Sequence, residues 1–429
     1  MKTAYVREPK PGARLRFLSK LGPGLITGAA DDDPSGVGTY SIAGAQFGYA
    51  CLWTAWFSFP LMAAIQLICA RLGMVSGRGL AGLLRERYGH WVLWPACALL
   101  AIANVVNMGA DLGAMAASTA MVTGIPGYYF APLYAGLIGS LMAWTSYHRI
   151  AKVFKWMTLV LFAYVAAAFL ARPNWQGVLH ATLIPHVEWS SRYMAIFVAV
   201  LGTTISPYLF FWQAIQEVEE KRDHGKTTVA QRRGATEQEK SDSRFDVIIG
   251  MLLSNVIMYF IILTTGATLH VHGHTDIVTT QQASEALRPL AGKAAYLLFT
   301  LGIVGTGMLS VPVLAGSTAY AIAEAGKWRD SLKYAPRHAP ELYAALIASL
   351  FLALVLNYAG FGVVAMLFWS AVINGVLAPP LIVLVVILSS DPRVMGRHIA
   401  SPLLLALGWL TAAVMTLAAV GMFFTSSKA

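Results

Sequence analysis

The chain has 429 residues, of which 57% are hydrophobic and 12% are charged, and its formal net charge at pH 7 is +10. Soluble domains carry about 25% charged residues, so this composition excludes an ordinary soluble protein and indicates one that crosses a membrane many times. The basic residues lie mostly between apolar segments, as in a membrane protein, and no nucleic-acid partner is needed to explain them.

Apolar segments of about the length that crosses a bilayer core as a helix follow one another along the chain. They cover residues 22–48, 50–70, 91–123, 131–147, 156–171, 194–216, 246–268, 294–323, 340–357, 361–388 and 400–424. The sequence therefore predicts an all-α polytopic membrane protein with 11 transmembrane helices.

The Lys and Arg residues predict the orientation of these helices, because cytoplasmic loops are enriched in both. If the N-terminus is cytoplasmic, 26 of the 31 Lys and Arg residues fall in cytoplasmic segments. We therefore predict a multi-pass protein of a bacterial-type plasma (inner) membrane. Residues 1–20 would form a cytoplasmic N-terminal segment, 21–424 the transporter domain, and 217–245 a flexible cytoplasmic loop.

Two of the predicted helices contain a proline among small or hydroxyl residues. The first reads GAADDDPSGVG at residues 28–38, and the sixth reads GTTISPYLFF at residues 202–211. Proline removes a backbone hydrogen bond, so both helices are expected to unwind at bilayer depth. Such paired breaks are typical of secondary transporters built from inverted repeats. The repeats would cover about residues 21–172 and 193–388, with helix 11 at about 400–424.

The first break places three consecutive carboxylates, Asp31, Asp32 and Asp33, inside a predicted span. An ionised carboxylate in hydrocarbon is unstable without a counter-charge or a wet cavity. Since Arg and Lys are confined to the loops, we expect the positive charge to come from protons or from a bound cation. Carboxylate and carbonyl oxygens suit Mg²⁺, Mn²⁺ or Ca²⁺. Asp31 and Asp32 have an alternative interpretation, in which they line an aqueous vestibule without touching substrate.

The third predicted helix carries a polar stripe within the sequence NVVNMGADLGAMAAS. Asn104, Asn107 and Asp111 recur at spacings of three and four residues, which places them on one helical face. The stripe either serves a proton or ion pathway or hydrogen-bonds to a neighbouring helix.

Two stretches of the sequence resemble the natural resistance-associated macrophage protein (NRAMP) family. They read GPGLITGAADDDPSGVGTYSIAGAQFGYACLWTAW and CARLGMVSGRGLAGLLRERYG. The order of spans is similar over roughly residues 20–388. This family consists of proton-coupled carriers of divalent metals, so the resemblance implies the leucine-transporter fold with broken helices 1 and 6. The site residues depart from the family pattern, which indicates a divergent branch.

Matching the first break to the family implies that Asp33 is the metal-binding aspartate. Gly36 stands where the family has a metal-binding asparagine. The resemblance also implies that the backbone carbonyl of Ala30 contributes to the site, and Asp32 is a further candidate ligand.

In the sixth helix the family reads Met-Pro-His, and Ser206 and Tyr208 stand where it has Met and His. Thr203 would supply the second backbone carbonyl, and Gln213 stands where the family has a later histidine. Asp111 matches its proton-relaying aspartate, and Asn107 and Gln213 are further candidates for a proton pathway.

The residues together predict a secondary transporter that imports a divalent cation by alternating access, with Mg²⁺ or Mn²⁺ as the expected ion. Replacing thioether and imidazole groups by hydroxyl and carboxylate groups favours such hard ions. Proton coupling is expected to be weak or absent because relay residues are missing. We expect no enzymatic activity, no resident cofactor and a monomer. The alternative is a carrier of an amine or amino acid on the same scaffold.

Overall fold

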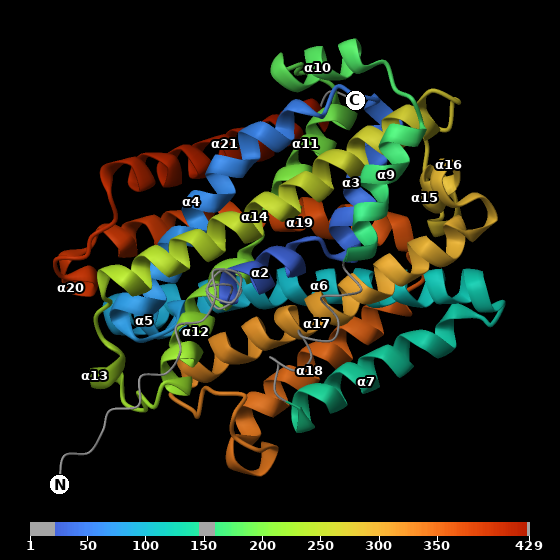
Figure 1. Cartoon of the computed structure of the whole chain (residues 1–429). Coiled ribbons are helices and arrows are strands. Elements are labelled where there is room, and N and C mark those ends of the chain that lie inside the picture. Colours follow the sequence, from blue (N-terminus) through green and yellow to red (C-terminus); the bar gives the residue numbers. More distant parts are fainter. Residues whose placement is uncertain (1–21, 146–158, 427–429) are drawn as a thin grey trace, which may run out of the picture.

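The computed structural model describes residues 22–145 and 159–426, and in this part of the chain it contains helices and connecting turns but no strand (Figure 1). The predicted all-α class is therefore confirmed. The predicted N-terminal segment 1–20 lies outside the described residues, as do parts of the predicted spans 131–147 and 156–171. The long helices are α4 (Trp53–Ser76), α6 (His90–Thr123), α14 (Glu237–Thr265), α17 (Ala295–Gly326), α18 (Pro340–Asn357), α19 (Val363–Ser390) and α21 (Pro402–Ser426).

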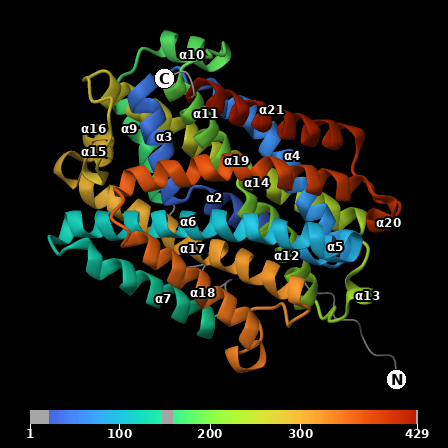
Figure 2. The same ribbon diagram turned by 180° about the vertical axis from the view of Figure 1, so that it is seen from behind.

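Shorter helices complete the bundle and its two ends. They are α2 (Pro23–Asp31), α3 (Pro34–Phe47), α5 (Leu80–Tyr88), α7 (Phe130–Trp144), α9 (Ala163–Leu170), α10 (Trp175–Leu183), α11 (Ser191–Thr204), α12 (Pro207–Asp223), α13 (Val229–Arg232), α15 (Thr280–Ser284), α16 (Arg288–Ala291) and α20 (Pro392–Met395). Helix α2 lies in the middle of the bundle in both views, and α3 runs from it beside α14 and α19 toward the end of the bundle that carries α9 and α10 (Figures 1 and 2).

Eight helical segments of the described chain are long and apolar enough to cross a membrane. The three remaining predicted spans correspond to shorter helices. The segment 22–48 is divided between α2 and α3, 131–147 contains the 15-residue α7, and 156–171 contains the short apolar stretch Leu159–Leu170. The count of 11 transmembrane helices therefore stays a prediction.

Helix α2 packs directly on α14 through glycines. A Cβ atom on Gly28 would lie 2.3 Å from the backbone oxygen of Gly250, and one on Gly250 would lie 2.2 Å from the backbone oxygen of Gly24. Small residues allow helix backbones to approach this closely in membranes. The contact holds α2 in the centre of the bundle.

The N-terminal end of α2 is capped by a side chain of α14. The carboxylate of Asp246 accepts hydrogen bonds from the backbone N–H groups of Gly22 at 2.9 Å, Gly24 at 2.5 Å and Leu25 at 3.0 Å. The first N–H groups of a helix lack partners within the helix, so this carboxylate satisfies them and complements the positive end of the helix dipole.

The prediction of a flexible loop at residues 217–245 is wrong for most of that segment. Helix α12 continues to Asp223, α14 begins at Glu237, and α13 lies between them. Glu, Lys, Arg and Gln favour helices, so a scarcity of apolar residues does not prevent helix formation. Thr236 and Glu239 form a capping box that starts α14. Only residues 224–236, which include α13, connect α12 and α14.

This connection is fastened to the end of α4 by a buried lysine. Lys221 Nζ donates hydrogen bonds to the carbonyl oxygens of Met74 at 2.6 Å and Arg232 at 2.9 Å, and also to that of Gly234. Gly234 N in turn donates to the Val75 oxygen at 2.8 Å. The segment is therefore ordered against the bundle.

Replacing Lys221 with Met is expected to accelerate tryptic cleavage at Arg232 and Arg233 by about 10-fold or more, because hydrogen bonds to a charged group contribute about 1.5–3 kcal/mol each. Limited proteolysis of the folded protein measures this rate. Lys226→Met is the matched control, since it also removes one tryptic site, while its 3.5 Å pair with Glu239 is long, partly exposed and weak. Equal rates in the two variants would contradict the anchoring role.

Candidate functional site

The first long apolar segment is broken at Asp32 and Asp33. Helix α2 ends at Asp31 and α3 begins at Pro34, while Asp33 has an extended backbone with φ −69° and ψ 168°. A residue before proline is disfavoured in the helical region, and proline offers no N–H to continue the ladder. The local sequence therefore places a stretch of free backbone in the middle of the bundle.

The sixth predicted span is broken for the same reason. Helix α11 ends at Thr204 and α12 begins at Pro207, with Ile205 at φ −120° and ψ 58° and Ser206 extended at φ −80° and ψ 136°. Both predicted breaks are therefore present in the structure.

Asp33 is buried with 1% of its surface exposed, and each of its carboxylate oxygens has a partner. Oδ1 accepts a hydrogen bond from Gly36 N at 2.6 Å, and Oδ2 accepts one from Asn107 Nδ2 at 2.7 Å. Asn107 belongs to α6, so the third predicted span holds the carboxylate in place from the side. The structure thus connects Asn107 directly to Asp33.

Asp31 and Asp32 are also buried, and they share a partner on α14. Ser254 Oγ lies 2.6 Å from Asp31 Oδ2 and 3.2 Å from Asp32 Oδ1, while Asp31 Oδ1 has no hydrogen-bond partner in the described part of the chain. In this structure neither carboxylate faces open water. Ser254 is a site residue that the sequence did not reveal, because one serine in an apolar span gives no information about which face it occupies.

The side chains at the second break turn toward backbone carbonyls. Tyr208 OH donates to the Ala30 oxygen at 2.9 Å, and Ser206 Oγ lies 2.8 Å from the Thr203 oxygen. A Cβ on Gly36 would lie 3.1 Å from Thr203 Oγ1 and 3.3 Å from Asp33 Oδ1. The two breaks therefore face each other, and the candidate residues of both spans meet around Asp33.

Asp111 lies in the same region and is fully buried. Its Oδ1 accepts a hydrogen bond from Ser35 N at 3.1 Å, and its Oδ2 accepts one from Ser310 Oγ of α17 at 3.1 Å. Ser35 is separated from Asp33 by one proline. Asp111 is therefore placed beside the first break.

The other asparagine of the polar stripe has a different role. Asn104 Nδ2 donates to the Leu314 oxygen at 3.1 Å and to the hydroxyls of Ser317 and Thr318, each at 2.8 Å. All three acceptors belong to α17. Asn104 thus joins two helices, whereas Asn107 joins its helix to Asp33.

Gln213 belongs to a separate polar chain along α12. Its Oε1 accepts from Thr27 Oγ1 at 2.7 Å, its Nε2 donates to Glu217 Oε1 at 3.0 Å, and Glu217 Oε1 also accepts from Ser243 Oγ at 2.8 Å. The structure therefore does not bring Gln213 together with Asp111. Glu217 was missed by the sequence reasoning, which placed it in a loop.

Two cavities lie at opposite ends of the bundle, and Asp33 lines neither of them. One, of about 420 Å³, is lined by Glu217, Ser243 and Asp246. The other, of about 610 Å³, is lined by His272 and His274 among others. The chain of hydrogen bonds through Gln213 reaches the first cavity.

None of the ion pairs in the described part of the chain includes Asp31, Asp32, Asp33 or Asp111. The same part of the chain holds no group of three or more His, Cys, Asp or Glu side chains arranged to bind a metal ion. A cation at this site would be bound by one or two carboxylates together with hydroxyl, carbonyl and water oxygens.

Two predicted spans of this bundle are broken near its middle, and buried carboxylates lie at the first break, as the leucine-transporter fold implied by the resemblance requires. The family described as natural resistance-associated macrophage protein-like (Nramp) matches residues 24–425. The chain therefore belongs to the Nramp family, as the resemblance implied.

Solved structures show the same fold. A manganese transporter of Eremococcus coleocola, in complex with an aromatic bis-isothiourea substituted compound, is 20% identical with a TM-score of 0.71, and the match covers 98% of this chain and 89% of that one. Mhp1, a nucleobase-cation-symport-1 family transporter in a closed conformation with bromovinylhydantoin bound, is 14% identical with a TM-score of 0.54, over 95% and 93% of the two chains. These matches confirm the predicted fold class.

Proposed function

We propose that this protein is a secondary transporter of a divalent metal cation and not an enzyme, with Asp33 as the central ligand. The observation that carries the proposal is a set of buried carboxylates at and beside the first helix break, Asp31, Asp32, Asp33 and Asp111, none of which has an ionic partner in the described residues. A buried carboxylate is costly unless it is paired, so the site favours a mobile positive charge. Membership of the Nramp family and the fold shared with a manganese transporter support a metal ion.

The ligand set points to a hard ion. Asp33 supplies a carboxylate, Ser206 a hydroxyl, and Ala30 and Thr203 supply carbonyls that each keep a second lone pair beside the hydroxyl they already accept. Gly36 lets Thr203 Oγ1 and Asp33 Oδ1 approach the same backbone closely, since a Cβ there would lie 3.1 Å and 3.3 Å from them. Mg²⁺ and Mn²⁺ accept such all-oxygen ligands, and Mg²⁺ retains several waters.

Movement of the ion would follow alternating access between the two cavities. The cavity lined by Glu217 and Asp246 would be cytoplasmic, which agrees with a cytoplasmic N-terminus and with import across a bacterial-type inner membrane. Breaks in two spans allow half-helices to rock about the site. Asp33 and Asp111 are the candidate proton carriers, while Gln213 joins Thr27 of α2 to Glu217 at the proposed cytoplasmic cavity.

Uptake into proteoliposomes that contain a pH-sensitive dye tests the proposal. We expect Mn²⁺ or Mg²⁺ to enter and each ion to compete with the other. Acidification of the lumen would identify proton coupling. Uptake of an amine or amino acid without any metal uptake would contradict the proposal and favour the organic-substrate carrier.

Replacing Asn107 with Ala is expected to weaken Mn²⁺ affinity by about 10- to 100-fold, because groups that orient a ligand contribute about this much to metal binding. The change removes the 2.7 Å hydrogen bond to Asp33 Oδ2. Isothermal titration calorimetry on the purified protein measures the effect.

Asn104→Ala is the matched control, since the same residue type on the same helix bonds to α17 instead. We expect this variant to lose thermal stability while its Mn²⁺ affinity stays close to wild type. Equal losses of affinity in both variants would show that Asn107 acts through general stability and not through Asp33.

A further inference from the structure

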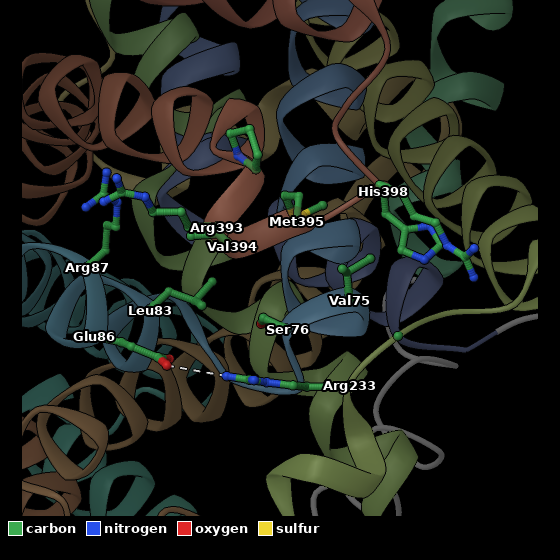
Figure 3. A pocket seen from close by; sticks show the side chains of 14 residues that line it. Val75, Ser76, Leu83, Glu86, Arg87, Arg233, Arg393, Val394, Met395 and His398 are labelled. Atoms are coloured by element: carbon green, nitrogen blue, oxygen red, sulfur yellow. Dashed lines mark hydrogen bonds and ion pairs between the residues drawn. The ribbon is translucent and has the colours of Figure 1, made fainter.

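A basic pocket lies at the same end of the bundle as the proposed cytoplasmic cavity. It has a volume of about 580 Å³ and is formed by the end of α4, by α5, by the connection after α13 and by the turn around α20. Figure 3 shows Arg87 and Arg393 on one side of the pocket and His398 on the opposite side. Arg233 lies beside Glu86 in the same view. Arg397 also lines it.

The carboxylates at this pocket are already neutralised. Glu86 pairs with Arg78 at 3.1 Å and with Arg233 at 3.3 Å, and Asp391 pairs with Arg87. These groups fix the geometry of the wall. Because both carboxylates are paired with arginines, the pocket does not favour a cation.

Two arginines of the lining, Arg393 and Arg397, are in none of the ion pairs of the described part of the chain. In the described part of the chain, the guanidinium groups of Arg393 and Arg397 make no hydrogen bond or ion pair with another side chain. Together with Arg78, Arg87 and Arg233, they give five arginines against two carboxylates, an excess of three positive charges. Planar guanidinium groups bind phosphate oxygens in a bidentate manner.

The imidazole of His398 lies beside these arginines and reports on the charge around it. Partial burial lowers the pKa of His398, and the nearby positive charges of Lys240 and Arg397 lower it further. Lys240 Nζ lies 3.2 Å from His398 Nδ1, a distance at which neutral imidazole accepts a hydrogen bond. The surroundings of this side of the pocket are therefore electropositive.

The pocket combines this charge with apolar surface. Val75, Leu83 and Met395 contribute to its lining, and α21 begins at Pro402, after His398, with Leu403 as its second residue, 69% of which is exposed. A positively charged wall next to an exposed apolar helix start is suited to an amphipathic anion. The arginines come from three distant parts of the chain and line one cavity. The enrichment of Lys and Arg in cytoplasmic loops does not by itself require this convergence.

We propose that this pocket binds a phosphate-bearing anion through Arg393 and Arg397. The phosphate would come either from the headgroup of an acidic phospholipid or from a soluble phosphate. Arg87 and Arg233 would form the fixed wall of the site. The proposal goes beyond metal transport and does not depend on it.

The test uses the full-length protein and the double variant Arg393→Gln with Arg397→Gln. In one arm, native mass spectrometry measures retention of phosphatidylglycerol by protein taken from nanodiscs. In the other, calorimetry measures binding of inorganic phosphate. Each basic residue near an anionic surface contributes about 1 kcal/mol, so we expect binding in one arm to fall by about 10- to 30-fold.

The control removes two other exposed basic residues from the same end of the protein, with Lys327→Gln and Arg337→Gln. Loss of phosphatidylglycerol retention in the pocket variant alone supports a lipid headgroup, and loss of phosphate binding alone supports a soluble anion. Absence of binding in both arms, or an equal loss in the control variant, overturns the proposal.

Discussion

Exchanging Asp33 for Asn is expected to weaken Mn²⁺ binding by more than about 100-fold and to abolish uptake. Asn keeps the size of the side chain and can still accept the hydrogen bond from Gly36 N, which is 2.6 Å in the wild type. It removes the charge, and a single pair of unit charges at 4 Å interacts by about 4 kcal/mol at an effective dielectric constant of 20. Calorimetry and proteoliposome uptake measure both effects.

Glu341→Gln is the control for the loss of one negative charge, because Glu341 is exposed, lines neither of the two cavities and is far along the chain from either helix break. It is expected to bind and transport as the wild type does. If a folded Asp33→Asn protein kept its Mn²⁺ affinity, Asp33 would not be the central ligand of the site.

Replacing Gly28 with Val is expected to prevent α2 from packing on α14. Even one Cβ atom at this position lies 2.3 Å from a backbone oxygen of Gly250, and backbone cannot rotate away as a flexible side chain does. Overpacking of this kind costs about 1–3 kcal/mol or more. We expect a strong fall in the fraction of monodisperse protein in size-exclusion chromatography and in its melting temperature.

Gly136→Val is the matched control, because Gly136 is an exposed helical position and a Cβ there would meet nothing within 4 Å. This variant is expected to behave as the wild type. Similar losses in both variants would mean that valine harms these helices through propensity and not through the contact between α2 and α14.

The sequence predicts those features that leave a local chemical signature. A proline after three carboxylates marks the break at Asp33, and a second proline marks the break before Pro207, since both effects act within one or two residues. The family follows from extended similarity. The Asp33 site therefore rests on residues that the sequence identifies directly.

Contacts between helices leave no such signature. In a span that is apolar on all sides, no periodicity shows which face meets a neighbour, so the bond of Asn107 to Asp33 and the placement of Ser254 were not predictable. The segment 217–245 was assigned to a loop on composition alone, although its charged residues favour helix and Lys221 finds carbonyl partners at the end of α4.

The cap on α2 has a mechanical consequence. Asp246 belongs to α14 but completes the first turn of α2, and the adjacent glycine contact lets the two backbones touch. If the proposed alternating access swings this half-helix outward, α2 must either carry α14 with it or break three hydrogen bonds at once. The second route raises an activation barrier, so in the proposed transport cycle a weaker Asp246 cap would change the rate at which α2 moves more than the affinity for the ion.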